Sequence, residues 1–266
     1  MTDANRYQRI IERIFLDYYK DGAEEVQFDR DDIRRVARKL RIQLPKNLGD
    51  IIYTFRYRSS LPKAIRSRAP KGKEWVILPA GPGRYRFVGR TLTQIAPNEA
   101  LAETKIPDAT PGLIEMYALT DEQALLAKLR YNRLIDVFSG VTCCSLQSHL
   151  RTTVPGMGQV ETDELYVGVD RKGAHYILPV QAKGGNDRLS IVQIEQDLAL
   201  CQAKFSALIC RPIAAQFVQH DLIALFEFEE GDRGVALCRE NHYRLVAPEE
   251  LSPEDLKNYR DRLPEK

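Results

Sequence analysis

Residues 160–183 constrain the fold of this chain more than any other segment, because they read as two β-strands joined by a turn. The run 160–167 is rich in β-branched and aromatic side chains, and the run 176–183 is apolar up to Val180. The short polar segment between them contains Gly173, as tight turns often do. An apolar run of this length is typical of a strand buried on both faces. We therefore predict a sheet built around this hairpin.

Four polar side chains stand at alternating positions of the predicted hairpin. Alternate residues of a strand share a face, so Glu161 and Asp163 lie together, as do Gln181 and Lys183. If the two strands are neighbours in that register, the four side chains converge on one polar patch. Oxygen ligands of this kind suit a hard divalent cation such as Mg²⁺, and a lysine beside them can orient a water. The alternative interpretation is that these charges only keep the edge of a sheet soluble.

The arrangement resembles the PD-(D/E)xK nuclease superfamily, in which an acid on one strand precedes a (D/E)-x-K signature on the next. The resemblance implies that Asp163 is the metal-binding acid, that Gln181 fills the second ligand position and that Lys183 is the signature lysine. Asp163 and Gln181 are 18 residues apart, no proline precedes Asp163, and Gln181 replaces the usual acid. The expected cofactor is Mg²⁺, with Mn²⁺ as a substitute, and Glu161 is expected to supply the charge that Gln181 lacks.

The surrounding sequence matches the αβββαβ core of that superfamily, which predicts an α/β (α+β) fold of the restriction-endonuclease-like type. Asn186 or Asp187 can cap the helix that follows the hairpin. Glu122 is either a further acid of the site or a charge favoured by the helix dipole. The periodicity predicts helices over 121–138 and 188–205, and strands over 207–217, 222–229, 234–238 and 242–246.

The amino-terminal third predicts a separate domain. Helices are expected over 5–21, from Asp29 to Leu40 and from Asn47, followed by short strands over 75–78 and 85–88. Three helices and a hairpin in this order are similar to a winged-helix domain, a variant of the helix-turn-helix. We therefore expect a winged-helix-like domain over 1–90, a linker over 91–119 and the nuclease-like domain over 120–266.

Positive charge is concentrated in this amino-terminal domain. From Arg34 to Arg90 the chain carries sixteen Lys or Arg against two acids, whereas the whole chain has a net charge of only +2. Such an excess favours a polyanion partner, because neutralising phosphates releases counterions. The alternative is an ordinary solvated face. The candidate residues for binding double-stranded DNA are Arg56, Arg58, Lys63, Arg66, Arg68, Arg84 and Arg86.

Composition excludes several other classes of function. No apolar run approaches the ~20 residues that span a bilayer, and the first residues do not resemble a signal sequence, so we expect a cytoplasmic protein without a membrane partner. Five cysteines without C-x-x-C spacing argue against a disulfide framework and a structural zinc site, and are expected to be reduced and buried. The histidines, among them His149, are far apart and are expected to be surface or structural residues.

Together the two halves predict a Mg²⁺-dependent, sequence-specific DNA endonuclease similar to type II restriction enzymes. Cutting both strands of a symmetric site requires two active sites, so a homodimer is expected. Two alternatives remain open at the level of sequence. One is a nuclease of repair or recombination that recognises DNA structure, and the other is a non-catalytic DNA-binding regulator in which Gln181 reports a lost active site.

Overall fold

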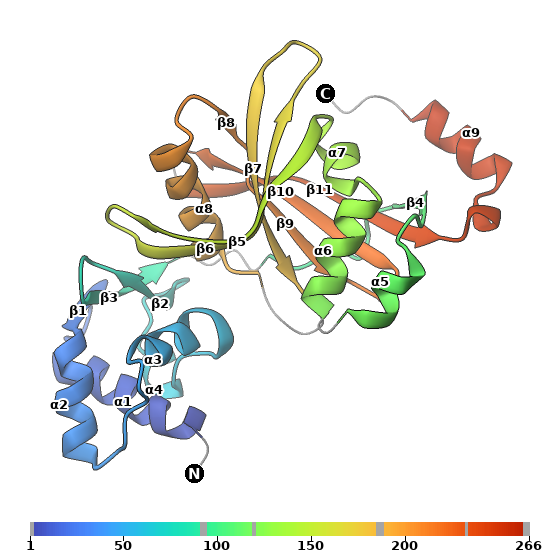
Figure 1. The fold of residues 1–266 in the computed structure, drawn as a ribbon. Coiled ribbons are helices and arrows are strands. Elements are labelled where there is room, and N and C mark those ends of the chain that lie inside the picture. Colours follow the sequence, from blue (N-terminus) through green and yellow to red (C-terminus); the bar gives the residue numbers. More distant parts are fainter. Residues whose placement is uncertain (1–2, 91–94, 119–120, 185–188, 232–233, 263–266) are drawn as a thin grey trace. The chain divides into compact units, whose positions relative to one another are not determined.

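The computed structural model describes residues 3–90, 95–118, 121–184, 189–231 and 234–262, without the side chains of 3–5, 57 and 58. The chain divides into two compact units (Figure 1). Unit 1 comprises residues 1–93 together with 153–159, and unit 2 comprises 94–152 and 160–266. The short segment 153–159 of unit 1 contains the turn between two long strands.

Unit 1 combines helices with a three-stranded antiparallel sheet of order β1-β3-β2. Its elements are α1 (Asp3–Tyr18), β1 (Glu25–Asp29), α2 (Arg30–Leu40), α3 (Gly49–Tyr53), a π-helical turn (Thr54–Arg58), α4 (Lys63–Arg66), β2 (Glu74–Pro79) and β3 (Arg84–Arg90). The predicted helices and both predicted strands are present, with α1 ending three residues earlier than expected. Strand β1 was not predicted, because its five residues include only two apolar ones.

The core of unit 1 is built by the apolar stripe of α1 packed on the sheet. Ile10, Ile11, Ile14 and Phe15 are fully buried, and the Phe15 ring meets that of Phe87 edge-on at 5.1 Å between centroids. This is the outcome expected for an amphipathic helix with apolar residues at helical spacing. Burial of these side chains contributes the main stabilisation of the unit, at about 1.5–3 kcal/mol for each large apolar side chain.

The predicted start of α2 at Asp29 is confirmed. Asp29 lies in the extended conformation just before the helix, and its backbone N–H donates to Oδ2 of Asp32 at 2.8 Å. Asp32 also accepts from the Tyr18 hydroxyl at 2.7 Å and pairs with the Arg35 guanidinium at 2.9 Å. The carboxylate of an acid in the first turn of a helix can accept from the backbone N–H of the residue before the helix. That N–H has no hydrogen-bond partner within the helix.

Unit 2 is organised around one mixed sheet with strand order β4-β11-β10-β9-β7-β6-β5, and β8 pairs with β7 outside that path. Its strands are β4 (Glu103–Pro107), β5 (Thr142–Val154), β6 (Gly158–Val169), β7 (His175–Lys183), β8 (Ile209–Cys210), β9 (Ile213–Phe217), β10 (Leu222–Gly231) and β11 (Gly234–Val246). Its helices are α5 (Gly112–Tyr117), α6 (Asp121–Tyr131), α7 (Leu134–Ser139), α8 (Ile191–Lys204) and α9 (Pro253–Asp261), and a 3₁₀ turn spans Pro248–Glu250.

The two faces of β7 pack against different helices. Leu178 and Val180 belong to the same buried cluster as Leu125 of α6, whereas Ile177 packs with Cys201 of α8. Alternate residues of one strand therefore face opposite layers, as strand geometry requires. Figure 1 shows α6 and α8 on either side of the sheet. Strand β7 is parallel to β9, and α8 makes the crossover between them.

The structure corrects several boundaries. The predicted linker 91–119 contains β4, which pairs with β11, and the helix α5. Strand β5 was not predicted, because most of its side chains are exposed and polar. The helix expected over 121–138 is two helices, because Arg133 takes a left-handed φ of 51° between α6 and α7. The strand expected over 207–217 is interrupted before Pro212, which has no backbone N–H to donate.

Other predictions have mixed outcomes. The fold is mixed α/β of the α+β type, as predicted. Ser190 caps α8 by accepting from the Val192 N–H, whereas the predicted caps Asn186 and Asp187 lie outside the described residues. All cysteines are free, but Cys144 and Cys238 are exposed rather than buried. Among the described residues, no helix is both long enough and apolar enough to cross a membrane.

Candidate metal centre

The backbone hydrogen-bond ladder between β6 and β7 ends where both strands carry polar residues, and side-chain contacts replace it there. Main-chain pairing runs from the pair Val169–His175 as far as the pair Glu164–Val180. Beyond that pair, the Ala182 N–H donates to Oδ2 of Asp163 at 2.8 Å. The Asp163 carboxylate thus accepts from a backbone N–H that would otherwise pair with a backbone carbonyl of the neighbouring strand. This hydrogen bond fixes Asp163 at the end of the ladder.

Asp163 and Lys183 lie together, as the sequence predicts. Oδ2 of Asp163 is 3.9 Å from Nζ of Lys183, and only 8% of Asp163 is exposed. Burial raises the pKa of the Asp163 carboxyl above its ordinary value, against the opposing effects of the Lys183 charge and the Ala182 amide. Burial disfavours the ionised carboxyl, and the nearby ammonium favours it.

Gln181 lies in a buried network directed toward α8. Its Nε2 donates to the Asp197 carboxylate at 2.9 Å and to the Glu161 carbonyl at 3.2 Å, and its Oε1 accepts from Nε2 of Gln193 at 3.0 Å. Gln181 and Asp197 are each 1% exposed, and burial raises the pKa of Asp197 well above its ordinary range. Both polar atoms of the Gln181 carboxamide are therefore engaged by the protein itself.

Sequence reasoning missed the α8 side of this network. Gln193 and Asp197 are four residues apart, which places them on one face of the helix, between apolar neighbours. Polar residues at helical spacing inside an otherwise buried helix are the signal that could have identified them. Their partner could not have been named, because it lies on a strand whose register with α8 is set by the fold.

An arginine of β5 binds the carboxylate of Glu161. Both of its oxygens accept from Nη2 of Arg151, at 3.0 and 2.9 Å, and its side chain is partly exposed. Glu161 was expected to add negative charge beside Asp163. In this structure that charge is paired with an arginine across the strands, so Glu161 is not one of the carboxylates grouped with Asp163.

A different set of donors gathers at Asp163. Glu122 at the start of α6, His149 on β5 and Asp163 on β6 each place one ligand atom so that all three atoms lie within 4.8 Å of one another. Asp163 is buried, Glu122 is half-buried and His149 is exposed. Glu122 was one of the sequence candidates, whereas His149 was expected to be an unrelated surface or structural residue. Side chains from three elements therefore meet at one position.

Gly184 allows α6 to begin so close to the end of β7. A Cβ at this position would lie 2.5 Å from Cβ of Asp121 and 3.3 Å from the backbone nitrogen of Glu122. Any side chain here would push the first turn of α6 away from the strand. The glycine after Lys183 is thus the reason that Glu122 can reach the polar end of the hairpin.

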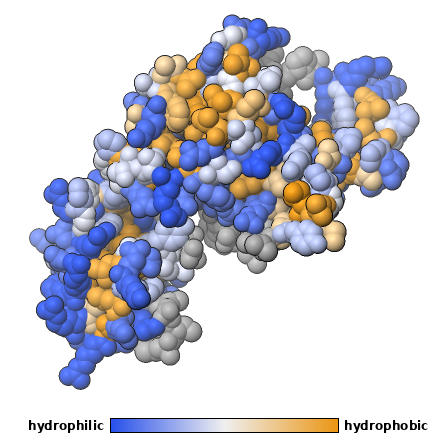
Figure 2. Space-filling view, viewed as in Figure 1, coloured by the Kyte–Doolittle hydropathy of each residue, from blue (hydrophilic) through white to orange (hydrophobic). Residues whose placement is uncertain are grey.

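The basic candidates of unit 1 differ in their surroundings. Lys63, Arg66, Arg68 and Arg84 are exposed, and Figure 2 shows hydrophilic residues over much of the visible face of this unit. Arg86 pairs with Glu25 at 3.0 Å, which compensates its charge. Nε and Nη2 of Arg56 are buried, so this guanidinium is turned inward. The side chain of Arg58 lies outside the described residues.

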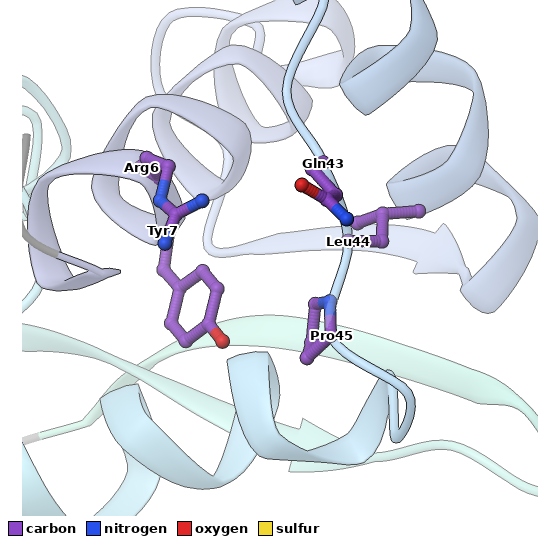
Figure 3. A pocket seen from close by; sticks show the side chains of 5 residues that line it. All are labelled: Arg6, Tyr7, Gln43, Leu44 and Pro45. Atoms are coloured by element: carbon purple, nitrogen blue, oxygen red, sulfur yellow. The ribbon is translucent and has the colours of Figure 1, made fainter.

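A shallow pocket lies elsewhere in unit 1. Figure 3 shows Arg6 and Tyr7 of α1 facing Gln43, Leu44 and Pro45 of the segment that follows α2. Its lining holds one cationic side chain and no acid, and it includes none of the predicted site residues. This pocket has a different composition from the group around Asp163 and is not part of it.

Comparisons with protein-family models, with curated proteins and with solved structures found no match to this chain. What the group around Asp163 can do follows from its donor atoms, its charges and its burial. Two carboxylates and one imidazole offer a divalent cation oxygen and nitrogen ligands, and an ammonium stands beside them.

Proposed function

We propose that this protein is a metal-dependent deoxyribonuclease of the PD-(D/E)xK type, in which unit 1 binds double-stranded DNA and unit 2 hydrolyses a phosphodiester bond. The observation that carries the proposal is the meeting of Asp163, Glu122 and Lys183 where the main-chain pairing of β6 and β7 ends. Two acids can hold a divalent cation for the hydrolysis of a phosphodiester, and a lysine beside them can position the attacking water.

The order of elements supports both halves of this proposal. In unit 2, α6 and α7 are followed by β5, β6 and β7, then by α8, the two-residue β8 and β9, which is parallel to β7; apart from α7 and β8 this order fits the αβββαβ core. In unit 1, α1 and β1 are followed by the three helices α2, α3 and α4 and then by β2 and β3, and the one antiparallel sheet supports the resemblance to a winged helix. Fold by itself does not establish activity, so the argument rests on the residues of the site.

Asp163 and Glu122 are suited to hold the divalent cation. Carboxylate oxygens are the preferred ligands of Mg²⁺ and Mn²⁺. Two oxygens bound to one such ion at about 2.1 Å cannot be more than about 4.2 Å apart, so atoms within 4.8 Å of one another need only a small side-chain movement. When bound, the cation would stabilise negative charge on a phosphate and lower the pKa of a water.

The residues of the chain perform the remaining tasks. The Ala182 N–H holds Asp163 in place, and Lys183 positions a water and offsets charge that develops on the phosphate. Gln181 is assigned a positioning role, because its carboxamide joins β7 to Asp197 and Gln193 of α8. Lys63 and Arg66 are exposed cations that can contact the DNA backbone.

Sequence-specific cleavage of both strands completes the proposal. A palindromic site presents two scissile bonds related by a two-fold axis, and two copies of one active site match that symmetry. We therefore propose a homodimer that acts on cytoplasmic DNA in the manner of a type II restriction enzyme. A structure-specific nuclease would use the same chemistry, but it would not cut intact linear or supercoiled duplex into discrete fragments.

One observation favours a second candidate, a non-catalytic DNA-binding regulator. The position where the superfamily carries an acid holds the neutral Gln181, whose carboxamide is engaged by Asp197 and Gln193. A site with one fewer negative charge binds a cation more weakly. A regulator of this kind would bind DNA through unit 1 without metal and would leave the DNA intact.

The deciding experiment is incubation of the purified full chain with unmethylated plasmid and phage DNA in Mg²⁺ or Mn²⁺. EDTA and the Lys183→Ala variant serve as controls. Discrete fragments that disappear in both controls support the endonuclease. Tight DNA binding without any cleavage in either metal would overturn it in favour of the regulator.

A further inference from the structure

We infer that His149 is a third metal ligand and that the site therefore prefers Mn²⁺ to Mg²⁺. The inference rests on the proposed metal site for its location, and it adds a residue that determines which cation the site takes. Neither the hairpin motif nor the charge pattern of the sequence points to this histidine. The assignment comes from its position relative to the two carboxylates.

The position of His149 is set by the pairing of β5 with β6. Arg151 of β5 binds both carboxylate oxygens of Glu161 on the neighbouring strand. His149 lies two residues before Arg151 on β5, and Asp163 lies two residues after Glu161 on β6. The backbone of β5 takes a left-handed φ of 48° at His149, which interrupts the regular strand there. At this position a ligand atom of His149 lies within 4.8 Å of one of Asp163.

Glu122, the remaining donor of the group, belongs to a separate element, α6. The ligand atoms of Glu122, His149 and Asp163 lie within 4.8 Å of one another, although the residues belong to α6, β5 and β6. Exposure rises from buried Asp163 through half-buried Glu122 to exposed His149, so the group opens toward solvent on the histidine side. On that side, water or a phosphate oxygen can complete the coordination of an ion.

The chemistry of these donors discriminates between cations. Mg²⁺ strongly prefers oxygen ligands and retains several waters, whereas imidazole is a good ligand for first-row transition ions. A set of two carboxylates and one imidazole neutralises a divalent charge and offers the nitrogen that Mn²⁺ accepts more readily than Mg²⁺. His242, which unlike His149 is buried, contacts Glu240 at 2.8 Å and belongs to no such group.

The test measures cation binding by the full chain in the absence of DNA. Mn²⁺ is titrated while free Mn²⁺ is followed by electron paramagnetic resonance, and Mg²⁺ is then added to displace it. The informative variant is His149→Asn, because asparagine tolerates the left-handed φ of 48° at this position and replaces a nitrogen donor by an oxygen donor. His149→Ala removes the donor altogether, and His175→Ala, an exposed histidine at the other end of β7, is the matched control.

The expected result is tighter binding of Mn²⁺ than of Mg²⁺ by the wild-type protein. His149→Ala should weaken Mn²⁺ binding by about tenfold or more and weaken Mg²⁺ binding much less. His149→Asn should reduce the preference for Mn²⁺ by shifting affinity toward Mg²⁺, and His175→Ala should match the wild type. Circular dichroism and a thermal melt confirm that each variant is folded.

Three results would overturn the inference: absence of Mn²⁺ binding by the wild type, unchanged Mn²⁺ affinity in a folded His149→Ala variant, or equal losses for both cations. Loss of cleavage with unchanged Mn²⁺ affinity would make His149 a proton-transfer group instead of a ligand. The proposed nuclease function fails separately, if the wild type binds Mn²⁺ through His149 but cuts no DNA.

Discussion

The two units place their polar residues in opposite ways. Unit 1 keeps most of its charges on the surface, although Asp32 is buried and the Arg56 guanidinium is turned inward. Unit 2 buries acids, amides and hydroxyls together, among them Asp163, Gln181 and Asp197. Burying such groups costs free energy unless they are bonded to one another, so their presence requires a specific network.

Under the proposed function, this difference gives the two units different tasks on one substrate. A surface on which cations outnumber acids attracts a polyanion over a distance and without a specific geometry. A buried polar group acts only at close range, but the protein holds it in one geometry. The predictions below change one kind of residue at a time and measure whether binding, chemistry or stability responds.

The largest effect is expected for the buried acid of the candidate metal centre. Asp163→Asn should lower the rate of DNA cleavage by at least about a thousandfold, because it removes a negatively charged metal ligand. DNA affinity in EDTA should remain within about twofold of the wild type, because the basic residues of unit 1 are untouched. Plasmid nicking and fluorescence anisotropy measure the two quantities.

Asp170→Asn is the matched control for that variant, since Asp170 lies at the turn of the same hairpin. It should cleave like the wild type. Wild-type cleavage by Asp163→Asn would remove Asp163 from the site and leave Glu122 and Glu161 as the acids to test.

The second effect concerns a buried ion pair of unit 2 that lies outside the site. Arg211 donates to Oε2 of Glu227 at 2.7 Å and to the Ser139 carbonyl at 2.9 Å, and both charged side chains are mostly buried. Arg211→Met should lower the free energy of unfolding by about 3 kcal/mol, because it leaves Glu227 without its partner. Urea denaturation measures this loss.

The double variant Arg211→Met with Glu227→Leu should recover much of that stability, because no uncompensated charge remains. Equal losses in the single and double variants would mean that packing, and not charge, accounts for the effect.

The third effect tests the surface charge of unit 1. Lys63→Ala combined with Arg66→Ala should weaken DNA binding by about tenfold and reduce the salt dependence of affinity by about two counterions. Cleavage per bound complex should not change. Anisotropy titrations at several salt concentrations measure both. Arg13→Ala is the control, because Arg13 of α1 is paired with Asp17 at 2.8 Å, and an unchanged slope in the double variant would contradict the proposed interface.

The smallest effect concerns Asp32, the buried acid of unit 1. Burial opposes its ionisation, but the Asp29 amide, the Tyr18 hydroxyl and Arg35 together lower its pKa below the ordinary 3.8. Its stabilising effect is therefore complete above that value and is lost as the pH falls through the lowered pKa of the folded state. Asp32→Asn should cost about 1 kcal/mol at neutral pH, and the difference from wild type should shrink below pH 3.8.

The exposed neighbour Asp31 provides the comparison for this variant. Asp31 pairs with Arg34 at the surface, and Asp31→Asn should change stability by less than about 0.5 kcal/mol at any pH. Thermal melts across the pH range measure both. Equal effects of the two substitutions would show that burial of Asp32 contributes nothing.

Local patterns in the sequence were sufficient for several elements. The apolar stripe of α1, the cap at Asp29 and the hairpin of β6 and β7 depend on neighbours within a few residues. Strands β1 and β5 escaped prediction, because they are too short or too polar to show a clear alternation. The segment 91–119 was interpreted as a linker because its prolines interrupt periodicity, although β4 pairs with β11 more than a hundred residues away.

In the candidate site too, local patterns predicted some of the contacts and failed to predict others. Asp163 and Lys183 were predicted as neighbours because strand alternation and one turn are enough to bring them together. The Gln181–Asp197 bond required the packing of α8, and the meeting of Glu122 with His149 required α6 to begin against Gly184 and β5 to align with β6. Sequence by itself determined that Asp163 and Lys183 are neighbours along one hairpin. Only the tertiary structure decided which donors surround them, because contacts between distant segments depend on register and packing that no local pattern encodes.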